Sequence, residues 1–346
     1  MKKALKWPQK CLFNKSCYIF LMELILPFKV TFFPKKISYP DKILFIGSCF
    51  SEEIGARMSN LKFDVLQNPN GILYDPVSIS SALNSYIIHG PYEVKDLFFQ
   101  NDLWHSWNHH SVFSGLDKEE VLRKIGNARE EAHQFLKNTS WLIISLGTSF
   151  NYSLKNERIQ VANCHKAPGG YFEKKLITIE ETIASLSATI NNLREFNADL
   201  KIIFTVSPVR HVKDGVVENN RSKARLLEAV HFITEKLQDI FYFPAYELVI
   251  DVLRDYRFYK TDLVHPTDAA IDFVFESFCN ALLDEPGKKL LEEITMVLAA
   301  RNHKPFQKES AAHRNFMKTQ LEKINGISEK FPSIDFLKER KYFTGD

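Results

Sequence analysis

Sequence features that mark several classes of protein are scarce or missing in this chain of 346 residues. Its five cysteines show no C-x-x-C pair or other paired spacing, so no disulfide framework is indicated. Only 13 glycines and 14 prolines occur, which excludes collagen-like and Pro/Gly low-complexity chains. The 45 basic and 42 acidic residues leave a charge of +3, which is no nucleic-acid signature. What the chain does have is 28 Phe and 12 Tyr, enough apolar surface for a globular fold.

The start of the chain differs from the rest. Residues 1–21 carry five lysines and no acidic residue, and an apolar run follows to about residue 28. This run is too short for a transmembrane helix, which needs about 20 apolar residues. Glu23 and the lack of an A-x-A-like site argue against a signal peptide. We therefore expect a cytoplasmic protein without a stable membrane span. Export is the alternative if residues 1–28 act as a signal, and translation from Met22 would remove the basic excess.

Beyond this segment, short apolar runs alternate with stretches of helical periodicity. Strands are predicted at residues 43–46, 62–66, 141–146, 201–206 and 245–251. Helices are predicted at residues 51–60, 77–88, 117–138, 178–196, 220–239 and 267–283. Residues 92–115 look irregular, and residues 151–175 look like a long connection. The alternation predicts an α/β fold with a mostly parallel sheet covered on both faces.

We divide the chain into three parts. Residues 1–37 form an N-terminal extension, residues 38–285 the α/β domain, and residues 286–346 a helical tail. The tail resembles an amphipathic helix pair, with its last twenty residues frayed. Such a pair packs either on the domain or on a second chain, which leaves a homo-oligomer open.

A candidate catalytic set lies where predicted strands end. In parallel α/β folds, ligands bind beyond the carboxyl ends of the strands. Ser48 follows the first strand and precedes a helix, where N–H groups and the helix dipole favour a developing anion. A plain helix cap is the alternative role for this serine. Asp262 and His265 form D-L-V-H, a spacing that lets the carboxylate fold back onto the imidazole. Together they would supply nucleophile, orienting acid and base.

An oxyanion hole must complete such a site. Candidate donors are the N–H groups near Ser48 and of Gly71, together with the side chain of Thr148 or Asn151 after the third strand. A simple turn with positive φ is the alternative role of Gly71.

At this point the sequence resembles a known family. Residues 46–51 read Ile-Gly-Ser-Cys-Phe-Ser, similar to the signature of GSCFA-domain proteins, with Ser51 in place of Ala. This family is a bacterial branch of the SGNH/GDSL hydrolase superfamily. The similarity covers about residues 38–285, through residues 68–76, 103–107, 146–148, 161–166, 206–211, 218–223, 242–244, 255–259 and 262–266.

The resemblance implies a three-layer, flavodoxin-like α/β/α hydrolase fold with Ser48 as nucleophile and His265 as base. The superfamily places an Asn after a Gly at the end of the third strand as an oxyanion donor. This chain has Thr148 after Gly147 there, so the choice between Thr148 and Asn151 stays open.

Cys49 adjoins the expected nucleophile and is the competing one, because a cysteine at a helix N-terminus can have a lowered pKa. Neighbouring side chains in a strand-to-helix turn point in different directions. If Ser48 faces the site, we therefore expect Cys49 to face the core.

Several polar and aromatic residues invite a metal interpretation. The residues that suggest zinc are His105, His109, His110, Cys164 and His165. Their spacing fits no familiar site, so we expect no metal and no other cofactor. We prefer a lid in which Trp104, His105, Trp107 and His109 cover the pocket. Expected substrate contacts are Trp104, His105, Trp107, His165, Arg210 and His211. Loop-closing hydrogen bonds are the alternative for Arg210 and His211.

The chain is thus predicted to be a serine esterase or acyltransferase of SGNH type. Its substrates would be O-acyl esters, for example acetyl esters, of a glycan or small molecule, with no nucleic-acid partner. The alternative is a non-catalytic module that binds a glycan or partner through the aromatic loop. The intact Ser, Asp and His set argues against that alternative.

Overall fold

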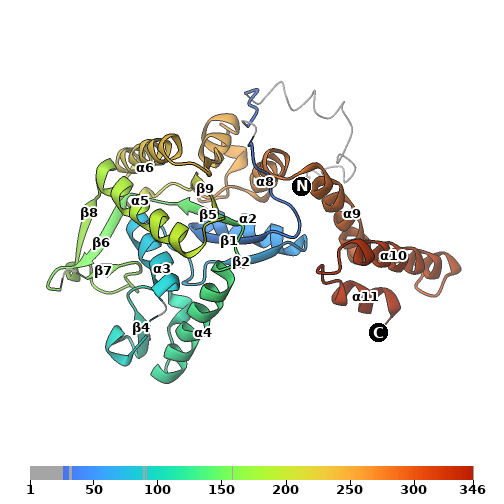
Figure 1. Ribbon diagram of the computed structural model, residues 1–346, viewed down its shortest axis with the longest axis horizontal. Coiled ribbons are helices and arrows are strands. Elements are labelled where there is room, and N and C mark those ends of the chain that lie inside the picture. The colour runs from blue at the N-terminus through green and yellow to red at the C-terminus, as the bar shows by residue number, and fades with distance from the viewer. Residues whose placement is uncertain (1–25, 31–32, 89, 91, 158, 346) are drawn as a thin grey trace, which may run out of the picture.

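A five-stranded parallel sheet forms the centre of the computed structural model, which describes residues 26–30, 33–88, 90, 92–157 and 159–345 (Figure 1). Its strands are β1 (Lys42–Gly47), β2 (Asp64–Gln67), β5 (Trp141–Leu146), β9 (Lys201–Val206) and β10 (Ile240–Tyr242). They lie in the order β10-β9-β5-β1-β2, and every pair is parallel. In chain order this is 2-1-3-4-5, the flavodoxin-like arrangement, so the predicted fold is confirmed. The lysine-rich start and Met22 lie outside the described residues.

Alternate side chains of β1 enter two separate cores. Ile43 and Phe45 belong to one core, and Leu44 and Ile46 belong to the other. The first face of the sheet is covered by α2 (Cys49–Asn60) and α8 (Asp268–Leu282). The second is covered by α3 (Pro76–Ile88), α4 (Lys118–Leu136), α5 (Ile179–Phe196) and α6 (Val216–Lys236). Burial on both faces explains why the strands are continuous apolar runs in the sequence.

The fifth strand is not where the sequence predicted it. Residues 245–251 are helical: α7 (Ala245–Glu247) leads into a π-helical turn at Leu248–Val252. Leu248, Val249 and Val252 are buried, a helical spacing rather than the alternation of a strand. The short β10 takes the edge position instead. The prediction was wrong because a short apolar run does not by itself distinguish a strand from a buried helix.

Two segments expected to be irregular form small antiparallel sheets. Strands β3 (Leu97–Gln100) and β4 (Leu103–Ser106) make a hairpin, whose two turn residues Asn101 and Asp102 both have positive φ. The expected long connection contains β6 (Phe150–Leu154), β7 (Gln160–Val161) and β8 (Phe172–Leu176), in the order β7-β6-β8. Both small sheets lie to the side of the central five-stranded sheet (Figure 1).

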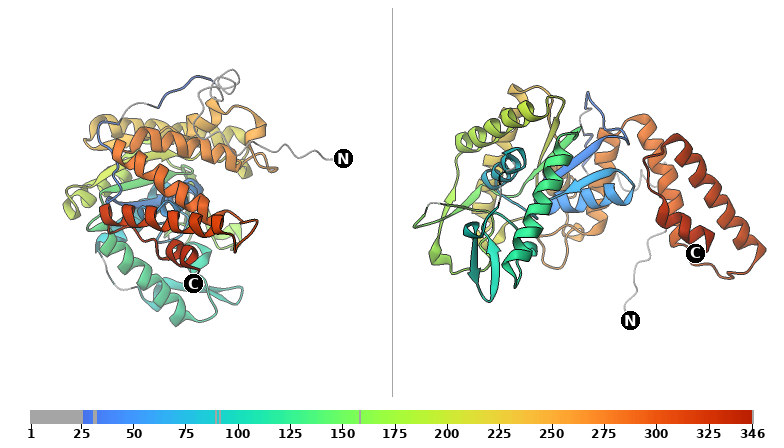
Figure 2. Two further views of the ribbon diagram at one scale, coloured as in Figure 1. Left: turned by 90° about the vertical axis from the view of Figure 1, so that its right-hand side faces the viewer. Right: turned by 60° about the horizontal axis from the view of Figure 1, so that its bottom comes forward.

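The tail forms three helices that stand out from the sheet domain (Figure 2). They are α9 (Glu285–Asn302), α10 (Ala311–Lys330) and α11 (Leu337–Thr344). The last helix replaces the frayed end that the sequence suggested. It is held by Glu339, which is 1% exposed and accepts from Lys62 Nζ at 2.8 Å and Arg301 Nη1 at 2.7 Å. Across the ranges that the structure describes, no helix combines the length and apolarity needed to cross a membrane.

Candidate active site

The candidate site lies at the carboxyl ends of β1 and β5. These two strands flank the point where the strand order reverses, which is where doubly wound folds bind ligands. Gly47 ends β1 with φ +129°, and a Cβ at this position would lie 2.1 Å from the carbonyl oxygen of Ser145. Only glycine permits this close approach, so Gly47 brings the first residues of α2 against the end of β5.

Ser48 is the N-cap of α2 and faces the protein interior. Its Oγ accepts from the N–H of Phe50 at 3.3 Å and lies 2.6 Å from Oγ of Ser145. The residue is 1% exposed. The structure therefore gives Ser48 a capping role, and its role as nucleophile stays a prediction.

Asp262 and His265 make the contact that their spacing predicts. Oδ2 of Asp262 lies 2.7 Å from Nδ1 of His265, while Oδ1 accepts from the N–H groups of His265 and Val264 at 3.0 and 2.9 Å. These backbone N–H groups, with the imidazole, favour the carboxylate and hold the pKa of Asp262 well below its usual range. Because Nδ1 is occupied, Nε2 is the ring nitrogen that can exchange a proton with a nucleophile.

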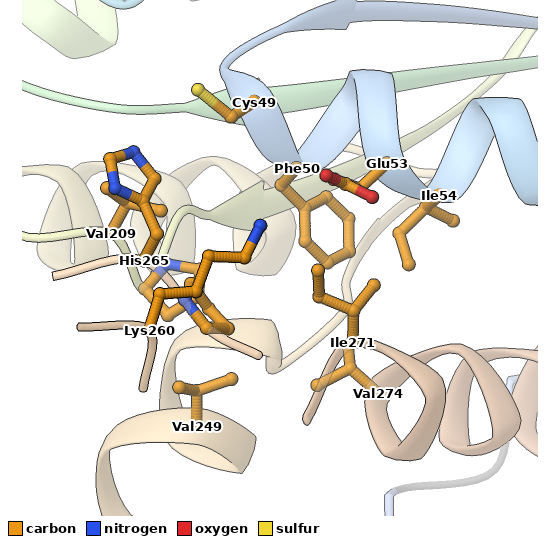
Figure 3. Close-up of a pocket in the computed structure, with 12 residues that line it drawn as sticks. Cys49, Phe50, Glu53, Ile54, Val209, Val249, Lys260, His265, Ile271 and Val274 are labelled. Carbon is orange, nitrogen blue, oxygen red and sulfur yellow. The ribbon is translucent and has the colours of Figure 1, made fainter. Parts of the chain in front are cut away.

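A pocket opens beside this pair (Figure 3). Its apolar wall consists of Phe50, Ile54, Val209, Val249, Ile271 and Val274. Cys49 and His265 both line it, and in Figure 3 the sulfur of Cys49 turns toward the side where the imidazole stands. Cys49 is half-buried. The expectation that Cys49 faces the core is therefore wrong, because Ser48 takes the inward direction at this turn.

A buried lysine, which sequence reasoning assigned no role, lies behind the same turn. Nζ of Lys223 donates to the carbonyl oxygens of Gly147 and Ser207, both at 2.6 Å. Burial lowers the pKa of Lys223 to about 7, and its electrostatic interaction with Cys49 opposes that fall. A signal for this group exists in the sequence: the charged Lys223 falls within the stripe of buried positions on α6, between Asn219 and Leu226.

The predicted oxyanion donors have partners within the protein. The N–H of Gly71 donates to the carbonyl of Asn68 at 2.6 Å and closes a turn. Oγ1 of Thr148 lies 3.0 Å from Oγ of Ser222. Nδ2 of Asn151 donates to Asp75 Oδ1 at 2.9 Å. Donation from any of them to an oxyanion stays a prediction.

The predicted lid residues pack around the β3–β4 hairpin. Trp107 stacks on Phe98 with ring centroids 3.5 Å apart, and Trp104 packs near Phe99. Both ring nitrogens of His105 have hydrogen-bond partners, and burial lowers the pKa of His165 to about 4. None of these four predicted contacts is among the described residues that line the pocket beside His265. Their role in substrate contact stays a prediction.

Arg210 and His211 follow Val209, which lines the pocket. The Arg210 guanidinium lies 4.9 Å from the centroid of the Tyr259 ring. The N–H of His211 donates to Oδ1 of Asn219 at 2.8 Å, which is the loop-closing bond expected as the alternative. In the part of the chain that the structure describes, no three His, Cys, Asp or Glu residues gather as a metal site would require.

These features define a doubly wound α/β protein with an Asp–His pair at the carboxyl edge of its sheet. The chain belongs to the GSCFA family: the model of that family matches residues 42–278. The model described as "GSCFA domain protein, C-terminal domain" matches residues 294–345, which include the second half of α9 and all of α10 and α11.

No curated protein matches the chain. Similar solved structures include two at low identity. One is the acetyl xylan esterase Est2A from Butyrivibrio proteoclasticus, at 14% identity and a TM-score of 0.36, with 76% of this chain and 66% of that chain covered. This chain thus spans just under two thirds of the esterase. The other is the periplasmic domain of a lipopolysaccharide acetyltransferase from Salmonella ser. Paratyphi A, at 14% identity and a TM-score of 0.31. The match covers 70% of this chain and 84% of that chain.

Proposed function

We propose that the protein is an acyl-ester hydrolase or acyltransferase in which His265 is the general base. The observation that carries this proposal is the 2.7 Å contact between Asp262 and His265 at the mouth of a pocket. A carboxylate on Nδ1 holds the imidazole in the tautomer that presents Nε2 as an acceptor. The start of α2 lies beside the same pocket, so a nucleophile from that turn lies on the side that His265 serves.

In the proposed reaction, a side chain at the β1–α2 turn attacks the ester carbonyl while His265 Nε2 takes its proton. Asp262 stabilises the imidazolium that forms. Backbone N–H groups at the start of α2 stabilise the oxyanion, helped by the helix dipole. The alcohol then leaves with the proton from His265. Water completes a hydrolysis, and a second hydroxyl completes an acyl transfer. The sequence assigns the nucleophile to Ser48.

The apolar wall of the pocket suits the acyl group of the substrate better than a charged or sugar group. The alcohol component then lies outside this wall, toward the charged side chains of Glu53 and Lys260 that also border the pocket. This favours O-acyl esters of a glycan or small molecule. A series of acetylated sugars and longer acyl esters would rank the acyl groups.

Hydrolysis of p-nitrophenyl acetate tests the proposed reaction. We expect His265→Ala to lose about 10²- to 10⁴-fold in turnover, the usual contribution of a general base. The matched control is His231→Ala, at an exposed histidine on α6, which should turn over like the wild type. Equal background rates for wild type and His265→Ala would contradict the proposal. The non-catalytic binding module would then be the remaining interpretation.

A further inference from the structure

We infer that the nucleophile is the thiol of Cys49 rather than the hydroxyl of Ser48, so that catalysis passes through a thioester. This inference rests on the proposed function, since it names the attacking group of that reaction.

The two neighbouring side chains at the β1–α2 turn have different surroundings. Ser48 points inward, with Oγ engaged by Ser145 and by the N–H of Phe50. Attack by Ser48 would require it to leave both partners and turn out of an interior where it is 1% exposed. Cys49 is half-buried and already borders the pocket.

The thiol and the base share one cavity. His265 and Cys49 both line the pocket, and Figure 3 shows the sulfur turned toward the side occupied by the imidazole. With Asp262 on Nδ1, the proton acceptor of the imidazole is Nε2. In this arrangement Cys49 is the nucleophile, His265 is the base and Asp262 is the orienting carboxylate.

The surroundings of Cys49 keep its thiol protonated until a base removes the proton. Burial raises the pKa of Cys49, and Glu52 and Glu53 raise it further, while the hydroxyl of Tyr74, 3.9 Å from Sγ, works in the opposite direction. The resting group is therefore the neutral thiol, which needs a base before it can attack. Once formed, the thiolate lies at the N-terminus of α2 and within electrostatic reach of Lys223.

The proposed reaction passes through a thioester on Cys49. His265 takes the thiol proton, the sulfur forms a bond to the ester carbonyl carbon, and the tetrahedral oxyanion develops. The oxyanion collapses, the C–O bond to the alcohol breaks, and the alcohol leaves with the proton held by His265. Water or an acceptor hydroxyl then attacks the thioester, giving its proton to His265. The C–S bond breaks, and the leaving thiolate takes this proton from His265, which restores the neutral imidazole and the thiol.

Substitutions at the two neighbouring residues separate the assignments. With p-nitrophenyl acetate, we expect Cys49→Ala to lose about 10²-fold or more in turnover, while Ser48→Ala loses far less. Cys164→Ala, at another half-buried free cysteine, is the matched control and should keep the wild-type rate. Circular dichroism verifies that each variant is folded. Turnover kept in Cys49→Ala and lost in folded Ser48→Ala would overturn the inference.

A chemical readout on the wild-type protein does not depend on turnover or on a folded variant at residue 49. Iodoacetamide followed by peptide mapping should alkylate Cys49 faster than Cys164, and His265→Ala should slow the reaction at Cys49 alone. If no ester is hydrolysed but this pattern appears, the proposed ester chemistry fails and the activated thiol stands. If iodoacetamide alkylates Cys49 no faster than Cys164, and His265→Ala does not change the rate at Cys49, the inference about Cys49 fails whatever the ester activity.

Discussion

The hydroxyl of Ser48 lies 2.6 Å from the hydroxyl of Ser145, and this contact joins the start of α2 to the end of β5. Both residues are buried, and the close approach of Gly47 to Ser145 makes the contact possible. The serine of the signature motif is thus tied into the sheet, while its neighbour Cys49 faces the pocket.

The Ser48–Ser145 contact predicts a measurable coupling in stability. Ser48→Ala removes a helix cap, which costs about 1 kcal/mol, and leaves the Ser145 hydroxyl without this partner in the interior, at a cost of about 1–3 kcal/mol. Ser145→Ala should cost less, because the cap remains. Urea unfolding of both single variants and the double variant gives the coupling free energy. Strictly additive losses would show that the contact contributes nothing.

The Asp262 turn predicts an acid-dependent loss of stability. The folded pKa of Asp262 is depressed by the N–H groups of His265 and Val264. Its stabilising contribution is therefore present above the unfolded pKa of about 3.9 and is lost as the pH falls toward the folded value. The difference in unfolding free energy between wild type and Asp262→Asn should narrow from pH 5 to pH 3. Asp199→Asn, at an exposed loop carboxylate, is the control, and an equal narrowing there would contradict the assignment.

Lys223 predicts a rise of stability with pH as well, but in the alkaline range. Its folded pKa of about 7 lies below the ordinary value of about 10.4, so between these values the folded state binds fewer protons than the unfolded state. Stability contributed by this group therefore rises with pH across that window. Wild type should gain in unfolding free energy relative to Lys223→Met between pH 7 and pH 10. If the difference in unfolding free energy between wild type and Lys223→Met stays constant or falls over this range, the lowered pKa assigned to Lys223 is wrong.

Two glycines predict opposite responses to the same substitution. Gly71 has φ +75°, and a Cβ there would lie 2.3 Å from Cβ of His110, so Gly71→Ala should cost about 2 kcal/mol or more from backbone strain and overpacking. Gly126 lies within α4 with open space at its Cβ position. Gly126→Ala should stabilise by about 0.5–1 kcal/mol. Thermal unfolding of both variants checks the pair. If Gly71→Ala leaves the stability unchanged, the steric explanation of this turn is wrong.

Local sequence patterns predicted the frame of the protein. The apolar runs at β1, β5 and β9 predict buried parallel strands, because strands covered on both faces need no alternation. The D-x-x-H spacing predicts the Asp262–His265 contact, since both groups belong to one short turn. Patterns failed at residues 245–251, where a short apolar run is equally compatible with a strand and a buried helix.

The sequence by itself determined the α/β class, the Asp–His pair and the strand-to-helix turn that carries both candidate nucleophiles. Tertiary structure decided which of the two candidate residues at that turn borders the pocket, because the choice depends on Ser145, which is 97 positions away in the chain and adjacent in the sheet. It also decided that Lys223 lies beneath the site, since the carbonyls that hold it directly follow the ends of β5 and β9. Both outcomes depend on contacts between distant segments, and local periodicity carries no information about such contacts.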